Sequence, residues 1–144
     1  MEDELERYEG PGGITLVDVR DGVLPREDIP APPRLLAMWE SALLAYADRS
    51  RVVPSEYRAL VMRENGDVLP TVLVDGYVAG VWRPADGGIE VTAFHGSPTR
   101  VWTALAIEAA SLLAFLADRD PAMYRRYVHW WDGLPADEIR VLGG

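Results

Sequence analysis

The dipeptide Asp75-Gly76 constrains the fold of this 144-residue chain more than any other feature of its sequence. It separates two β-rich runs, residues 69–74 and 77–83. Between such runs, Asp-Gly is a strong signal for a two-residue hairpin turn with positive φ at both positions. A third β-rich run, residues 88–94, follows a longer loop over residues 84–87. The sequence therefore predicts an antiparallel β-meander of three strands.

A three-stranded meander needs a cover for its apolar face, and the segment after Ser97-Pro98 supplies one. A serine followed by a proline is typical of a helix N-terminus. We predict an α+β fold, in which an antiparallel β-meander or a small partial barrel is covered by a long amphipathic helix, with short flanking helices. Apolar residues recur along that helix at helical spacing: Trp102, Leu105, Ala106, Ala109, Leu112, Leu113 and Leu116.

Four shorter elements are expected around this unit. Residues 34–46 are apolar on most sides, which favours a buried helix. Proline and acidic residues at their starts predict short helices over residues 54–62 and 121–131. The tail, residues 138–142, is expected to return as an edge strand.

Acidic residues concentrate near the N-terminus. Residues 1–33 hold nine acidic side chains and three arginines, in a chain whose net charge is −9. This segment is rich in proline and glycine around one β-rich run, Ile14–Val19. We therefore predict an acidic Pro/Gly-rich arm with one short strand over residues 1–33, followed by a single α+β domain over residues 34–144.

The amino-acid composition excludes several kinds of chemistry. Cysteine is absent, so the chain has no disulfide, thiolate zinc site, iron–sulfur cluster or cysteine nucleophile. Lysine is also absent, which excludes Schiff-base and P-loop lysines. No window approaches the ~20 uninterrupted apolar residues of a membrane span, and the acidic start is unlike a secretory signal. We expect a cytoplasmic protein that does not bind membranes and has no metal or cofactor.

No catalytic constellation is visible in the sequence. There is no Gly-x-Ser-x-Gly elbow, and neither His95 nor His129 has a nearby serine or acid that suggests a triad. Both histidines are expected to have packing or surface roles. The Asp-Gly sequences at residues 75–76 and 86–87 have no helix behind them, so they do not predict a phosphate-binding loop. No catalytic residue is predicted.

One candidate binding segment is Asp48-Arg49-Ser50-Arg51, which places two arginines in a loop beside a hydroxyl and a carboxylate. An Asp48–arginine salt link that fixes the loop is the favoured interpretation. The alternative is contact between the arginines and a phosphate backbone.

A second candidate segment is residues 124–131, where aromatic residues alternate with arginines. Such residues can stack on bases or bind a partner. Helical spacing favours packing instead, with one face turned inward and the other outward. The inward face would hold Tyr124, Tyr127, Val128 and Trp131, and the outward face Arg125, Arg126 and Trp130.

Two ordered motifs carry a resemblance to a known family. Residues 35–52, which end in Ala-Asp-Arg-Ser-Arg-Val, resemble a leucine-proline-x-phenylalanine-aspartate-x-x-leucine-leucine pattern that leads into alanine-aspartate-arginine-serine/threonine-arginine. Residues 70–83 resemble proline-threonine-valine-x-valine-aspartate-glycine-x-x-x-glycine-x-tryptophan. Over about residues 14–142, the chain is thus similar to the C-terminal region of winged-helix DNA-binding-domain proteins related to AlkZ. These relatives are bacterial DNA glycosylases that excise alkylated bases.

The resemblance implies a role near DNA without catalysis. In this family, glycosylase activity is attributed to a glutamine-x-glutamine motif in an N-terminal part that contains tandem winged helices, whereas this chain contains no glutamine. Trp39-Glu40 also replaces the family's phenylalanine-aspartate. We expect a truncated relative, a fragment of a longer product or one half of a split protein, without glycosylase activity.

Three functions are compatible with these features. The first is a non-enzymatic accessory domain that scaffolds an AlkZ-like protein. It would contact DNA through Arg49, Arg51 and Arg83 while a basic partner domain or a longer parent chain holds the DNA, since a chain of charge −9 binds phosphates poorly by itself.

The second function is a small-molecule-binding protein or enzyme with a pocket on the meander. The third is an interaction module whose acidic arm docks on a protein partner. Candidate residues for such a pocket or partner surface are Tyr77, Trp82, Tyr124, Arg125, Tyr127 and Trp130.

Overall fold

The computed structural model describes residues 5–119 and 127–143. The chain divides into two compact units, Met1–Pro30 and Ala31–Gly144. The predicted α+β class is confirmed, because the described residues form two antiparallel sheets and several helices, one of them long. Neither of these sheets closes into a barrel.

The first unit contains two strands where the sequence predicted one. Strand β1 (Leu5–Glu9) pairs antiparallel with β2 (Thr15–Val19), and a short 3-10 helix, η2 (Pro11–Gly13), connects them. The sequence of β1, Leu-Glu-Arg-Tyr-Glu, has no β-branched residue and three charges, so it carries little strand signal of its own. Its pairing with β2 makes it a strand.

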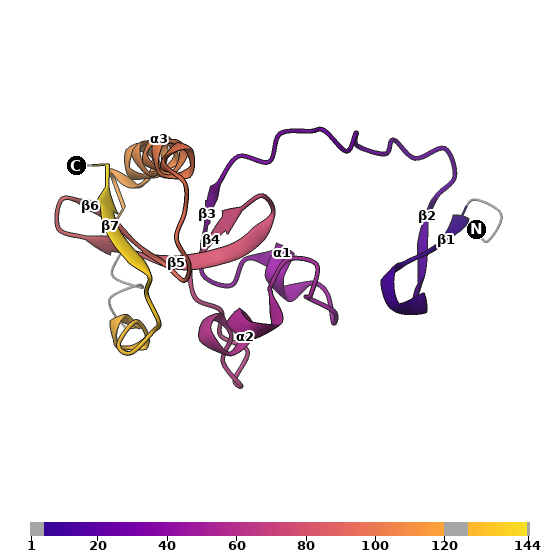
Figure 1. Ribbon diagram of the computed structural model, residues 1–144, viewed down its shortest axis with the longest axis horizontal. Coiled ribbons are helices and arrows are strands. Elements are labelled where there is room, and N and C mark those ends of the chain that lie inside the picture. Colours follow the sequence, from indigo (N-terminus) through magenta and orange to yellow (C-terminus); the bar gives the residue numbers. More distant parts are fainter. Residues whose placement is uncertain (1–4, 120–126, 144) are drawn as a thin grey trace. The chain divides into compact units, whose positions relative to one another are not determined.

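The second unit is built on a five-stranded antiparallel sheet in the order β3-β4-β5-β6-β7 (Figure 1). The predicted meander is confirmed as β4, β5 and β6, and the predicted edge strand at the C-terminus is confirmed as β7. The strands are β3 (Arg34–Leu36), β4 (Thr71–Val74), β5 (Tyr77–Ala85), β6 (Gly88–Ala93) and β7 (Glu138–Leu142).

Both turns of the meander are tight. Asp75 and Gly76 connect β4 to β5 with φ of +49° and +82°, so the predicted two-residue hairpin turn is confirmed. The longer loop predicted over residues 84–87 is wrong. Strand β5 stays paired with β6 as far as Ala85, which leaves only Asp86-Gly87 in the turn.

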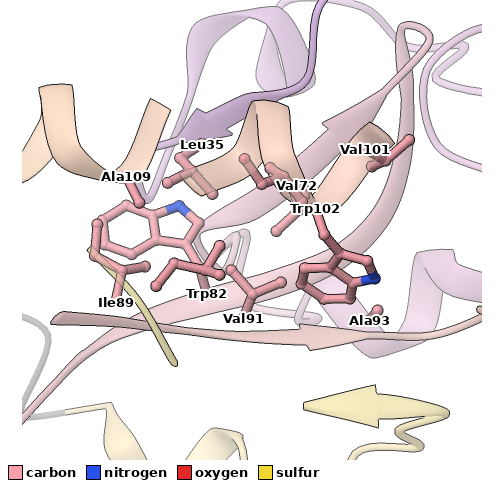
Figure 2. Packing of buried hydrophobic residues seen from close by; sticks show 11 residues of the cluster. Leu35, Val72, Trp82, Ile89, Val91, Ala93, Val101, Trp102 and Ala109 are labelled. Carbon is pink, nitrogen blue, oxygen red and sulfur yellow. The ribbon is translucent and has the colours of Figure 1, made fainter. Parts of the chain in front are cut away.

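Helix α3 (Thr99–Leu116) covers one face of this sheet, as predicted. Figure 2 shows Trp102 and Ala109 of the helix packed against side chains of the strands. Trp82 of β5 lies in this layer with only 1% of its surface exposed, and its indole N–H donates to the carbonyl oxygen of Leu36 at 2.8 Å. The cluster is Leu35, Val72, Trp82, Ile89, Val91, Ala93, Val101, Trp102, Leu105, Ala109 and Leu142.

Two short helices, α1 (Ser41–Leu44) and α2 (Ser55–Val61), lie on the opposite side of the sheet from α3 (Figure 1). With both faces covered, five successive residues of β5 from Val78 to Trp82 are buried, and the period of two typical of a half-buried strand is lost. The second cluster is Leu43, Val53, Val61, Val68, Leu69, Val78, Val81 and Trp131.

Residues 34–46 do not form the predicted buried helix. Leu35 and Leu36 belong to β3 and pack into the two different clusters, because successive side chains of a strand point to opposite faces. Trp39 takes a φ of +57°, which a helix does not allow, so only α1 is helical. An apolar composition alone did not distinguish a buried strand followed by a turn from a buried helix.

The helix predicted over residues 54–62 is confirmed as α2. The helix predicted over residues 121–131 lies largely outside the described residues. Its described end contains a 3-10 helix, η3 (Val128–Trp130).

Helix α3 has the length and apolar composition that could cross a membrane, with a mean hydropathy of 1.4 over 18 residues. Its apolar residues are not uninterrupted, because Arg100 and Glu108 lie within the helix. Its inner face packs on the sheet, while Ile107 and Phe115 on the other side are exposed.

Candidate nucleic-acid interface

Arg49, the first arginine expected to contact DNA, holds the loop after α1. Its Nε–H donates to the carbonyl oxygen of Leu43 at 2.6 Å and its Nη2–H to that of Leu44 at 3.3 Å. The last carbonyls of a helix have no partner within the helix, so the guanidinium satisfies them. Arg49 is half-buried and forms no ion pair with a described carboxylate.

Asp48 does not form the salt link that the sequence favoured. Its Oδ1 accepts the backbone N–H of Ser50 at 2.9 Å, as in an Asx turn. Hydrogen bonds from the Ser50 hydroxyl and N–H hold the pKa of the Asp48 carboxyl below its ordinary value, and the positive charges of Arg51 and Arg58 lower the pKa further. The salt link does not form, because the carboxylate of Asp48 accepts hydrogen bonds within its own turn and the guanidinium of Arg49 binds the carbonyl oxygens at the end of α1.

Arg63 lies just after α2 and was not singled out in the sequence. Its guanidinium Cζ lies 5.2 Å from the centroid of the Trp130 ring, and its Nη2–H donates to the Trp130 carbonyl oxygen at 3.3 Å. A cation over the face of an indole is favourable, so Trp130 holds the guanidinium in place. Nothing in the local sequence distinguishes Arg63, because Trp130 comes near it only in the folded chain.

Two open hollows in the surface meet at Arg63 and Glu64. The first has a volume of about 550 Å³, and its lining includes Arg49, Arg58 and Arg63 with Glu64 as the acid among them. Three positive charges and one negative charge make this hollow attractive to anions, although the whole chain is acidic. The second has a volume of about 590 Å³ and is lined by Arg63, Glu64, Asn65, His129, Trp130 and Asp132.

Three arginines without an acidic partner in the described residues line these hollows, and a fourth, Arg51, lies close enough to lower the pKa of Asp48 together with Arg58. Twelve arginines lie in the described residues, and five of them form ion pairs with a carboxylate. Of the seven that form none within the described part of the chain, four lie between residues 49 and 63. A guanidinium that is not paired with a carboxylate is available to bind an external anion. The arrangement of its N–H groups matches the oxygen atoms of a phosphate. We name Arg49, Arg51, Arg58 and Arg63 the arginine cluster.

Arg83, the third arginine expected to contact DNA, does not belong to this cluster. It lies on β5 opposite Glu90 of β6, and its Nε is 2.6 Å from the Glu90 carboxylate. The two side chains are 28% and 20% exposed, so the pair is partly shielded from water. The partner of Arg83 is set by strand register, so Glu90 already occupies its guanidinium, and its assignment as a DNA contact stays a prediction.

Four of the six residues expected to line a pocket or partner surface lie in the described part of the chain, and of these only Tyr127 and Trp130 come together. Tyr77 is exposed at the first hairpin turn, whereas Trp82 is a core residue, which corrects its assignment to a surface. Tyr127 and Trp130 are half-buried and pack on each other with ring centroids 4.6 Å apart, and Trp130 borders the second hollow. Tyr124 and Arg125 lie outside the described residues.

The histidines have no arrangement typical of catalysis or metal binding in the described chain. Nδ1 of His95 is hydrogen-bonded to the hydroxyl of Tyr57 at 3.1 Å, and the two rings stack. His129 lies at the edge of the second hollow. Over residues 5–119 and 127–143, no three His, Asp or Glu side chains are grouped closely enough to hold a metal ion.

Comparisons with known proteins connect this fold to DNA repair. A family model described as DNA glycosylase AlkZ-like matches residues 1–115. Among solved structures, the Streptomyces sahachiroi DNA glycosylase AlkZ is similar, with 27% sequence identity and a TM-score of 0.61. The match covers 77% of this chain and 30% of that one, so the chain spans less than a third of the glycosylase's length. No curated protein matches significantly.

The layered α+β unit and these matches define a protein of the DNA-glycosylase-related class. Since the family model matches well over half of the sequence, the chain belongs to the AlkZ-like DNA glycosylase family. The resemblance inferred from the motifs at residues 35–52 and 70–83 is thereby confirmed.

Proposed function

We propose that this chain is a non-catalytic accessory domain of the AlkZ-like family that contacts the phosphate backbone of DNA through the arginine cluster. The observation that supports this most strongly is the gathering of four arginines that have no acidic partner among the described residues, in a chain of net charge −9. Arg49 and Arg63 are held by backbone carbonyls and by Trp130, so little side-chain entropy is lost when they bind. Arg51 and Arg58 are exposed and complete the positive surface.

The proposed role does not include cleavage of the glycosidic bond. The glutamine-x-glutamine motif to which activity is attributed in this family requires residues that the chain does not contain. The DNA glycosylase activity named for the Streptomyces sahachiroi protein belongs to that protein, and this chain matches 30% of it. The domain acts as a scaffold while other domains or a basic partner hold the DNA.

Weak binding by the chain alone is part of the proposal. Non-specific DNA binding depends on the release of counterions from phosphates, and acidic surface opposes it. We expect at best millimolar affinity at physiological salt, weaker than the ~10⁻⁴–10⁻⁶ M of ordinary non-specific binders. A cytoplasmic location is compatible with this role and stays a prediction.

A fusion protein tests the role of the cluster. A basic winged-helix domain joined by a flexible linker supplies the anchoring, and fluorescence anisotropy of a labelled duplex measures the Kd. Replacing Arg51 and Arg58 by alanine should raise the Kd about tenfold on every duplex sequence, because phosphate contacts position a protein without reading bases. Neither side chain forms a hydrogen bond or ion pair within the described structure, so the fold should be unaffected.

The matched control replaces Arg7 and Arg119, which are also exposed and without an acidic partner in the described residues. It removes the same two positive charges from other parts of the chain. The control should leave the Kd nearly unchanged. Equal loss of affinity in both double variants would mean that only net charge matters, and would contradict the proposed contact surface.

A second candidate function rests on the β1–β2 hairpin. Its side chains include exposed Leu5, Tyr8 and Val17 among many acids, and an isolated two-stranded hairpin is marginally stable in water. Docking on a basic protein partner would bury this surface. A basic winged-helix domain added in trans should then shift the NMR resonances of β1 and β2, and unchanged resonances at millimolar partner would exclude this candidate.

A further inference from the structure

The outer face of α3 is unusually apolar for a surface. Phe115 is 69% exposed and Ile107 67%, the largest values for bulky apolar side chains among the described residues of the second unit. They lie away from the face that packs on the sheet through Trp102, Leu105 and Ala109. A surface helix normally carries polar residues on its outer face, so two bulky apolar side chains exposed there to this extent indicate a contact surface.

Five exposed residues and the half-buried Ala104 recur every three or four positions along α3 and just beyond its end, which is the spacing of a seam between two paired helices. Alanine and serine at three of these six positions allow a second helix to approach closely. Ala117 keeps helical dihedral angles after the last residue of α3, so the seam continues in phase. The seam consists of Arg100, Ala104, Ile107, Ser111, Ala114 and Asp118. Phe115 is the neighbour of Ala114 at the edge of the seam, where the guanidinium of Arg119 lies 5.3 Å from the centroid of its ring.

The polar side chains on this part of α3 already have partners. The hydroxyl of Ser111 donates to the carbonyl oxygen of Ile107 and that of Thr103 to Thr99, each at 3.1 Å. Burying these hydroxyls therefore leaves no donor unsatisfied. Glu108, which lies beside the seam, forms an ion pair with Arg34 of the same chain, and the distance from Nη1 of Arg34 to Oε2 of Glu108 is 3.2 Å. The centre of the seam can lose water at low cost.

Opposite charges stand at the two ends of the seam. Arg100 lies in the first turn of α3 and Asp118 just beyond its last turn, and neither forms an ion pair within the described residues. If two α3 helices pair in antiparallel orientation, Arg100 of each copy faces Asp118 of the other. The same register places Ala104 opposite Ala114 and Ile107 opposite Ser111. A parallel pair would place like charges together at both ends.

We propose that α3 is a self-association surface, through which two copies of this chain pair in antiparallel orientation with an Arg100–Asp118 ion pair at each end. The arrangement is a two-fold symmetric interface, in which each copy contributes the same patch. It goes beyond the proposed DNA contact, because none of the seam residues belongs to the arginine cluster. A dimer would carry two arginine clusters, so it would bind long DNA more tightly than a monomer if both can engage.

Sedimentation velocity of the full chain tests this, from micromolar to millimolar concentration. The mass should rise from 15.9 kDa towards twice that value. Ile107→Asp should keep the chain monomeric over the whole range, because it places a charge at the centre of the seam. Tyr46→Asp is the matched control, since Tyr46 is 66% exposed and lies outside α3, and it should leave the dimer intact. Thermal melts followed by circular dichroism show whether both variants are folded.

A charge swap tests the antiparallel register. Arg100→Asp and Asp118→Arg should each weaken the dimer at least about tenfold, because each places like charges together at both ends. The two substitutions combined should restore the affinity.

A monomer at every concentration, or a dimer that resists Ile107→Asp, would overturn the proposal. Failure of the combined swap to restore pairing would overturn it as well. Co-flotation of the chain with phosphatidylcholine–phosphatidylglycerol vesicles would assign the face to a membrane instead.

Discussion

At Gly80 the sheet leaves no room for a side chain. A Cβ atom there would lie 2.3 Å from the carbonyl oxygen of Thr92 and 3.1 Å from the Cα of Ala93. Both atoms belong to the backbone of β6 and cannot rotate away. Gly80→Ala should therefore lower the free energy of unfolding by about 1–3 kcal/mol, as measured by urea denaturation. An unchanged free energy would mean that β5 and β6 lie further apart than the structure shows.

Ser50 controls the protonation of Asp48 beside the arginine cluster. Its hydroxyl hydrogen bond is the largest of the effects that lower the pKa of this exposed carboxyl below 3.8. Ser50→Ala should raise that pKa towards 3.8, as followed by NMR of the carboxyl carbon. Ionised Asp48 has a depressed pKa in the folded state, so it contributes stability above its unfolded pKa and loses it as pH falls through the folded pKa.

The unsubstituted chain and the Ser50→Ala variant should therefore differ most in their free energy of unfolding near neutral pH. This difference should fade below pH 3.8, as Asp48 becomes protonated in both proteins. Ser55→Ala is a suitable control, because Ser55 bonds to Glu56 rather than to Asp48. If Ser50→Ala leaves the Asp48 pKa where it was, the turn does not hold the carboxylate as described.

Among the structural elements, the β4–β5 hairpin depends on its turn. Gly76 has a φ of +82°, and apart from its two chain neighbours no residue lies within 4 Å of a Cβ placed there, so a substitution acts through backbone strain. Gly76→Val should lower the free energy of unfolding by about 1 kcal/mol or more. Gly76→Asn should lose less, because asparagine tolerates the left-handed region better than valine. A melting temperature that Gly76→Val leaves unchanged would contradict the turn.

Elements with local signals could be predicted from the sequence, and those without could not. The meander follows from the turn at Asp75-Gly76, and α3 from apolar residues at helical spacing. Strand β1 and the residues of β3 were missed because their extended backbone depends on partner strands elsewhere in the chain. Helix α2 of the second layer was predicted from the proline and glutamate at its start, but the burial of both faces of β5 was not, because a fully buried strand has no alternation.

The candidate site was predictable only in part, for the same reason. Arg49 and Arg51 stand out in a local motif, whereas Arg58 and Arg63 join them only when α2 folds beside the loop after α1. Arg83 also lies in a family-like motif, residues 70–83, but its partner is Glu90 on the neighbouring strand, seven residues later in the chain. The sequence shows where the arginines lie along the chain, and the fold decides which of them are paired with a carboxylate.

For the whole molecule, membership of a glycosylase family does not predict glycosylase activity. We expect the chain to release no free base from alkylated duplex DNA, because it contains no glutamine for the motif to which that activity is attributed. Chromatography of the released base measures this against a reaction without protein, with Streptomyces sahachiroi AlkZ as the positive control. Release above the blank would contradict the non-catalytic role.

One local positive surface on this acidic chain is proposed to contact phosphate. Adding a short duplex to the ¹⁵N-labelled chain at low salt and following the amide resonances tests this contact. We expect small shifts in fast exchange, confined to residues 49–66 and the Trp130 indole, with affinity in the weak range expected for few phosphate contacts. Shifts centred on Arg83 and β6, or no shifts at millimolar duplex, would contradict it.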